Sequence, residues 1–277
     1  ALKQRQTDLT VLLTFYENLF QAQEAEKRQV RVDPIILDAS IPAKKITKEV
    51  PLVAPSEFHY DVSSCKRMLS VVCRLIKDTE NSMTASAQAI QGLVDQDAQV
   101  DALFDHLLKG DDAYFNDLAS NLHADKAAIA FMAYHSIRPS LLVCAEQLAG
   151  YLEAERELNT RQCAVCGHLP VMAVFDKEGK RELSCSFCEH RWPVRRLFCS
   201  YCGETDANQL QYLFIELESE YRIDVCNQCH HYLKTIDTRK TDRPIYLPLE
   251  QVASLHLDLN AQEKGYQSVV TLSLDTA

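Results

Sequence analysis

The chain has 277 residues, a formal net charge of −10 and 47% hydrophobic residues. This length suffices for two or three domains with a sizeable core, and the absence of a run of about eighteen apolar residues argues against membrane insertion. Residues 159–240 carry eleven basic and eleven acidic side chains. Because Lys and Arg dominate phosphate binding, this balance argues against a nucleic-acid-binding role.

Helical spacing of apolar residues dominates the first part of the chain. Residues 7–29 are predicted to form one amphipathic helix, and Ser56 is a candidate cap for the next helix. Further helical stretches follow from residue 82. Gly110 separates two of them, and Pro139 is expected to kink or split the last one. Repeated apolar stripes of this kind predict a helical bundle.

The segment 33–55, between the first two helices, is predicted to be irregular because it holds four prolines. It also contains a basic cluster formed by Lys44, Lys45 and Lys48. We interpret this cluster as part of a solvated loop. A contact point for an acidic partner is the less favoured alternative.

Six potential metal ligands of the helical region lack companions at metal-ligand spacing. We expect the cysteines among them to act as small buried hydrophobic residues and the histidines to be structural. They are Cys65, Cys73, Cys144, His106, His123 and His135.

Four Cys-x-x-Cys pairs follow, separated by 18, 10 and 23 residues. Two such pairs can surround one ion with a tetrahedron of sulfur, at about 2.3 Å for zinc. Only the longer gaps have room for a hairpin, so we pair the first with the second and the third with the fourth. The predicted ligand sets are Cys163, Cys166, Cys185 and Cys188, and Cys199, Cys202, Cys226 and Cys229.

Other interpretations of these cysteines are weaker. Disulfides need an oxidising compartment, and the first twenty residues do not resemble a signal peptide. A thioredoxin-like motif uses one pair in a βαβ setting. A ligand swap to His190, His230 or His231 is unnecessary when both four-cysteine sets are complete. Such sets leave no open coordination position for a catalytic metal, and the sequence has no nucleophile elbow, phosphate-binding loop or dinucleotide fingerprint, so we expect no enzyme.

Short β-type runs lie between the cysteine pairs. Residues 170–175 and 181–185 predict one hairpin, and residues 210–218 and 221–226 predict another with longer arms. The repeated layout indicates an internal duplication of a rubredoxin-like or zinc-ribbon-like unit.

The first cysteine pair of each module is followed by a glycine, Gly167 or Gly203. Glycine permits a positive φ there, so that backbone N–H groups can approach the sulfurs. The second pair of each module lacks this glycine. After the cysteines, apolar spacing predicts a final helix from Pro248 to Gly265.

These patterns predict an α+β fold, with an N-terminal α-helical bundle followed by two tandem rubredoxin-like or zinc-ribbon-like four-cysteine metal modules and a C-terminal helix. The expected domains are residues 1–158 for the helices, 159–197 for the first module and 198–277 for the second module with the final helix.

The stretches CAVCGHLPVMAVF, LSCSFCEHRW, CSYCGETD and VCNQCHHYLKT resemble the formate dehydrogenase accessory protein family, FdhE. The helical region and the closing SLHLDLNAQEKGY are also similar, so the resemblance covers most of the chain. It implies a cytoplasmic maturation factor that acts on the catalytic subunit of respiratory formate dehydrogenase. It also favours iron over zinc in the two sites, which spacing alone does not separate.

Two alternatives from other classes stay open. One is a rubredoxin-like electron-transfer or redox-sensing protein. The other is a zinc-ribbon nucleic-acid binder, which the balanced charge of the cysteine region disfavours. The expected partner is the catalytic subunit of formate dehydrogenase, without nucleic acid or membrane insertion, and self-association is left open.

Overall fold

The computed structural model describes residues 9–38, 45, 50–79, 81–94, 96–152, 160–215 and 218–270. The chain divides into two compact units. The first includes the chain up to Ile36 and Ala54–Gln147, and the second comprises Leu37–Val53 and Leu148–Val270. This division differs from the expected limits at residues 158 and 197. The segment Leu37–Val53 belongs with the cysteine region, and both cysteine modules lie in one unit.

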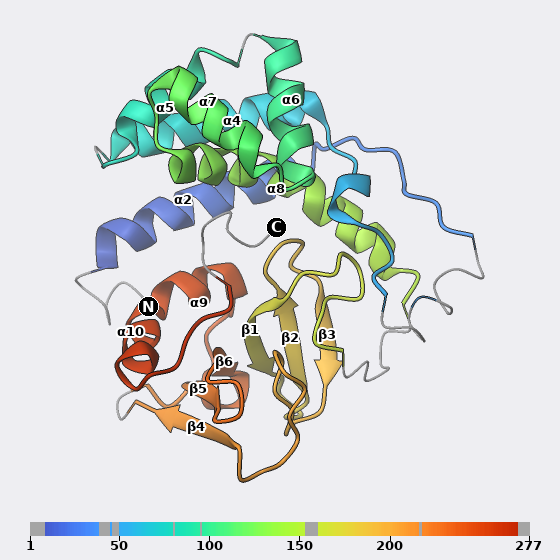
Figure 1. Cartoon of the computed structure of the whole chain (residues 1–277), viewed down its shortest axis with the longest axis vertical. Coiled ribbons are helices and arrows are strands. Elements are labelled where there is room, and N and C mark those ends of the chain that lie inside the picture. Colours follow the sequence, from blue (N-terminus) through green and yellow to red (C-terminus); the bar gives the residue numbers. More distant parts are fainter. Residues whose placement is uncertain are drawn as a thin grey trace. The chain divides into compact units, whose positions relative to one another are not determined.

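The first unit is built from helices (Figure 1). In the described residues, they confirm the predicted N-terminal helical region, and Cys65, Cys73 and Cys144 are buried as expected. The helices are α2 Thr10–Lys27, α4 Val62–Asp78, α5 Thr84–Gln91, α6 Asp97–Leu108, α7 Asp112–Leu122 and α8 Lys126–Ala149.

Aspartate side chains cap two of these helices. Asp61 accepts a hydrogen bond from a first-turn N–H of α4, so the cap expected at Ser56 is wrong. Ser56 instead lies in a short 3₁₀ helix, η2 Pro55–Glu57. Asp111 caps α7 in the same way. Helix α8 continues through Pro139 without being split.

Judged by length and composition, α8 is also the one described helix that could cross a membrane. However, 78% of its most apolar window is buried inside the protein. Burial of this extent is typical of the core helix of a helical domain, and the helix supplies central residues to the apolar core.

The second unit is built on one six-stranded sheet with the strand order β3-β2-β1-β6-β5-β4. Each module contributes three antiparallel strands, and the parallel pair of β1 and β6 joins the modules. The two predicted hairpins are present, but the third strand of each module and the shared sheet were not predicted. The strands are β1 Pro170–Phe175, β2 Arg181–Cys185, β3 Arg191–Val194, β4 Leu210–Phe214, β5 Tyr221–Cys226 and β6 Tyr232–Asp237.

Two short helices pack on one face of this sheet, where the sequence predicted one helix. They are α9 Leu247–Ala253 and α10 Leu255–Glu263. Lys234 of β6 ties the sheet to both helices, because its Nζ donates to the Gln251 carbonyl at 2.8 Å and to Asp258 Oδ2 at 2.7 Å. Residues of both hairpins and of α10 share the buried cluster at this face, formed by Met172, Val174, Tyr221, Ile223, Val225, Tyr232, Ile236, Leu257 and Ala261.

The predicted basic loop is described only in part. Lys44 and Lys48 lie outside the described residues. Lys45 donates a hydrogen bond to the Leu52 carbonyl at 2.7 Å, so it has a partner within its own unit.

Candidate metal centres

Each Cys-x-x-Cys pair forms a tight knuckle, and the four knuckles share one backbone arrangement. In each, the N–H of the first cysteine donates to the carbonyl five residues later, at 2.8–3.0 Å. The residue after the second cysteine has positive φ in every knuckle: 82° at Gly167, 58° at Glu189, 84° at Gly203 and 57° at His230. A non-glycine residue pays roughly 1–2 kcal/mol for this conformation. The knuckle shape is therefore imposed on Glu189 and His230, where no glycine signals it.

The knuckles gather the eight predicted cysteines into two groups. Within each group, the ligand atoms all lie within 4.8 Å of one another. The grouping follows the pairing predicted from the gap lengths: Cys163, Cys166, Cys185 and Cys188 form the first site, and Cys199, Cys202, Cys226 and Cys229 form the second site.

The sulfur spacings fit a tetrahedral metal ion. In the first site, the Sγ atoms of Cys163 and Cys188 are 3.7 Å apart, and those of Cys166 and Cys185 are 3.4 Å apart. The two equivalent cross-pairs of the second site are each 3.7 Å apart. Metal–sulfur bonds of about 2.3 Å give a tetrahedron with edges of about 3.8 Å. A disulfide would require about 2.05 Å, and all these cysteines are free.

The thiols of the first site differ in pKa. Burial opposes ionisation of Cys185, but hydrogen bonds with the neighbouring thiols outweigh it and hold its pKa well below the ordinary value. Burial raises the pKa of Cys166 and Cys188 well above that value. The Phe187 N–H also donates to Cys185 Sγ at 3.4 Å. Metal binding must displace the remaining protons, so affinity should fall in acid.

The second site shows the same division. Burial raises the pKa of Cys199 to about 11, against the effect of the nearby backbone N–H groups. Burial also opposes ionisation of Cys202, but hydrogen bonds from the Glu204 N–H and the other thiols lower its pKa. In each site, therefore, one thiol has a lowered pKa and at least one neighbour has a raised one, so a metal ion would have to displace protons on binding.

A distant segment covers the first site. The N–H of Leu52 donates to the Ala164 carbonyl at 2.8 Å, and the N–H of Val53 donates to the Val165 carbonyl at 3.1 Å. Both Leu52 and Val53 are buried. Nothing in the sequence of this predicted loop indicated the contact. All four cysteines of the first site are buried.

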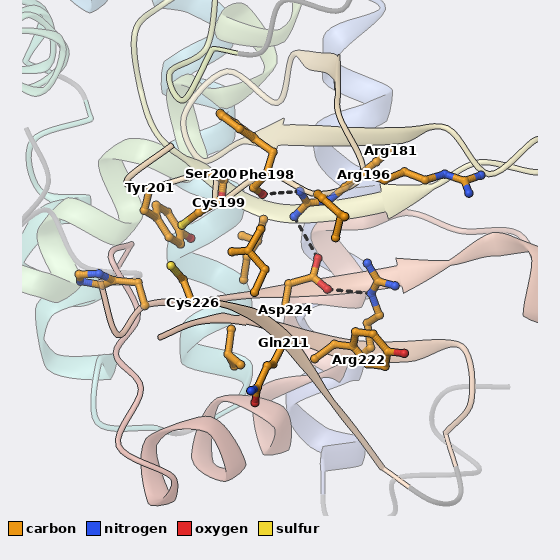
Figure 2. A pocket seen from close by; sticks show the side chains of 16 residues that line it. Arg181, Arg196, Phe198, Cys199, Ser200, Tyr201, Gln211, Arg222, Asp224 and Cys226 are labelled. Carbon is orange, nitrogen blue, oxygen red and sulfur yellow. Dashed lines mark hydrogen bonds and ion pairs between the residues drawn. The ribbon is translucent and has the colours of Figure 1, made fainter. Parts of the chain in front are cut away.

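The second site is more open. Cys202 is exposed and Cys229 is half-buried, whereas Cys199 and Cys226 are buried. Cys199 and Cys226 also line a hollow in the surface of the second unit (Figure 2). The two predicted sites are therefore alike in ligands and different in access.

The nearby histidines lie in ring contacts and outside both ligand groups of the described residues. His190 stacks on Trp192 with ring centroids 6.4 Å apart, and His231 packs edge-on against Tyr201 at 5.8 Å. His230 occupies the positive-φ position of the last knuckle. These positions favour the four-cysteine assignment over a histidine swap.

Comparisons with known proteins find similarity to FdhE proteins. The model of the FdhE C-terminal domain matches residues 197–274, which include the whole second site. A protein FdhE homolog from Aquifex aeolicus is 37% identical over 146 residues, covering 51% of this chain and 50% of that protein. Another, from Pectobacterium atrosepticum, is 26% identical over 256 residues, covering 88% and 75%. Over these segments the chain is similar to FdhE proteins.

A solved structure extends the similarity to the whole fold. The crystal structure of the FdhE protein from Pseudomonas aeruginosa matches 97% of this chain and 89% of that chain, with a TM-score of 0.62 and 21% identity. At this identity the match establishes the FdhE fold. The chain spans about half the length of the relatives from Aquifex aeolicus and from Escherichia coli K12.

Proposed function

We propose that this chain is a maturation factor required for active respiratory formate dehydrogenase, and that it binds the catalytic subunit of that enzyme in the cytoplasm. The observation that carries the proposal is the FdhE C-terminal match across an intact second four-cysteine module. Both ligand sets are complete tetrahedra of sulfur, which suits a structural role better than a reaction centre with an open coordination position.

We also propose that each four-cysteine site holds one metal ion. The FdhE resemblance favours iron, and zinc suits the same sulfur geometry. When bound, the ion cross-links two knuckles and neutralises thiolate charge. The hairpins between the knuckles then have a fixed geometry before a client arrives, so less conformational entropy is lost on binding.

Complementation of cells that lack the chain tests the proposal. The wild-type chain should restore formate dehydrogenase activity, whereas Cys166→Ser/Cys188→Ser should not, although synthesis of the catalytic subunit continues. Cys73→Ala, which alters a buried cysteine outside both sites, is the matched control and should complement. The purified chain alone should oxidise no formate. Full formate dehydrogenase activity in cells without the chain would contradict the assignment.

The exposure of Cys202 favours a second candidate function, a rubredoxin-like electron-transfer or redox-sensing protein. A partner protein can approach this ligand directly, which the cover over the first site prevents there. This candidate requires iron and a reversible change in visible absorption on reduction of the purified protein. Tightly bound zinc in both sites, with no such change, eliminates it.

A further inference from the structure

The sheet face opposite α9 and α10 carries the hollow beside the second site (Figure 2). The strand register places Tyr212, Asp224 and Leu233 next to one another, and all three line the hollow. Helices α9 and α10 pack instead against the alternate residues of β5 and β6. The two faces of this half of the sheet therefore differ: one is an apolar core, and the other opens to the surface.

The hollow carries net positive charge in a chain whose overall charge is −10. Among the described residues, Asp224 is the one carboxylate that lines the hollow, and it forms ion pairs with two arginines. Its Oδ2 accepts from Arg181 at 2.9 Å, and its Oδ1 pairs with Arg222 Nε at 2.7 Å. Arg196, a third lining arginine, donates only to a neutral group in the contacts seen here, the Gly179 carbonyl at 2.9 Å. An acidic ligand would complement this excess of positive charge.

Apolar side chains lie exposed beside these arginines. Leu197, Tyr212 and Phe214 are 56%, 54% and 55% exposed. The Tyr212 and Phe214 rings pack edge to face at 4.8 Å, with Arg222 5.3 Å from the first ring and Lys240 5.3 Å from the second. Clustered exposed aromatic residues are typical of interaction surfaces.

The aromatic pair belongs to an edge strand. In the described sheet, β4 is the last strand and pairs with β5 on one side. An edge strand presents backbone N–H and C=O groups to which an extended segment of another chain can add. Tyr212 and Phe214 lie on β4, and Arg222 lies on β5 opposite Phe214, with its guanidinium 5.3 Å from the Tyr212 ring. Arg196 lines the same hollow.

We propose that this surface binds an extended acidic segment of the client polypeptide. The segment lies along the edge of β4, with an apolar side chain on Tyr212 and Phe214 and a carboxylate at Arg196 and Arg222. The proposal takes the identity of the client from the proposed function and adds the surface and the chemistry of recognition.

Single-stranded nucleic acid also binds surfaces that combine basic and aromatic residues. A peptide is the better fit, because the edge of β4 offers backbone hydrogen-bonding groups that nucleic acid does not match.

The test measures binding of the purified, metal-loaded full-length chain to the purified catalytic subunit of formate dehydrogenase. Two double variants remove the surface, Tyr212→Ser/Phe214→Ser and Arg196→Glu/Lys240→Glu. Leu259→Ser and Lys264→Glu are matched controls, because both side chains are exposed on or next to α10. Each surface variant should weaken binding about tenfold or more, and each control should change it less than about twofold. Metal content and circular dichroism confirm that every variant is folded.

The outcomes separate the two proposals. Wild-type binding that both surface variants retain overturns this surface and leaves the proposed function standing. Failure of the wild-type chain to bind the subunit contradicts the proposed function, and this inference falls with it. Binding of labelled oligothymidylate that depends on the same four residues assigns the surface to nucleic acid and overturns the peptide proposal.

Discussion

The two four-cysteine sites share one backbone arrangement and differ in how closely other parts of the chain pack over them. A Cβ atom at Gly167 would lie 3.1 Å from Pro51 Cγ, whereas at Gly203 the nearest neighbour would be Arg161 Cδ at 3.7 Å. The cover over the first site comes from the segment Leu37–Val53, far away in sequence. Duplicated metal sites can therefore acquire different access without any change in their ligands.

Removing ligands from each site in turn should have the largest effect. Cys166→Ser/Cys188→Ser and Cys202→Ser/Cys229→Ser should each leave one metal ion per chain, because the four-cysteine sets are separate. The first pair should also destabilise the second unit by ~4 kcal/mol or more, since its ligands are all buried. Native mass spectrometry and denaturant unfolding measure both quantities. Loss of both ions from one pair of substitutions would show that the sites are not independent.

Acid sensitivity has a source outside both sites, which must be separated from metal release. Burial lowers the pKa of His135 to about 3. Between pH 6.5 and pH 3 the unfolded chain therefore binds a proton that the folded chain does not, so stability falls as the pH drops. From pH 7 to pH 5 the cost is about 2 kcal/mol.

His135→Gln should flatten this pH dependence when helix unfolding is followed by circular dichroism. Its metal content should match that of the wild-type chain, because His135 lies in the first unit. An unchanged slope in the variant would assign the acid sensitivity to other groups, including the cysteines.

Chelation should reveal the difference in access. The second site should lose its ion on the order of tenfold faster than the first, because local opening is needed only where packing covers the ligands. Leu52→Ala/Val53→Ala should reduce this difference by loosening the cover. Val50→Ala is the control, since Val50 is 44% exposed. Equal release rates in the wild-type chain would mean that burial does not govern exchange.

The smallest effect is expected for a cysteine outside both sites. Cys73→Ala should keep the full metal content and lose about 1 kcal/mol of stability. Its sulfur packs 3.8 Å from Met132 Sδ, so the loss reflects core packing alone. A fall in metal content measured by elemental analysis would be incompatible with a purely structural cysteine.

The sequence was most informative where the signal is local. Cysteine spacing predicted both four-cysteine groups. A largely apolar run followed by a turn located the first hairpin, Pro170–Phe175 and Arg181–Cys185, at its observed bounds. Contacts between segments far apart in the chain are not marked by a pattern in the sequence. The cover by Leu52 and Val53 uses backbone hydrogen bonds, which do not require particular side chains.

The knuckles and the sheet also contain features that no local sequence pattern indicates. Glu189 and His230 adopt a conformation usually marked by glycine, because the surrounding knuckle determines it. The parallel pair of β1 and β6 joins strands more than fifty residues apart in sequence, so neither strand alone indicates its partner. Missing this pair led to the expected boundary at residue 197, within what is one compact unit.

The junction of β1 and β6 means that the segment matched by the family model lacks one strand of the central pair of its sheet. The family match begins at residue 197, beyond β1. A fragment starting there would expose the edge of β6 and lose Phe175, whose ring lies 4.4 Å from the guanidinium of Arg222. An unpaired central strand is prone to join other chains. The duplicated modules have thus become mutually dependent, and deletion or transfer of one module would take away part of the other's framework.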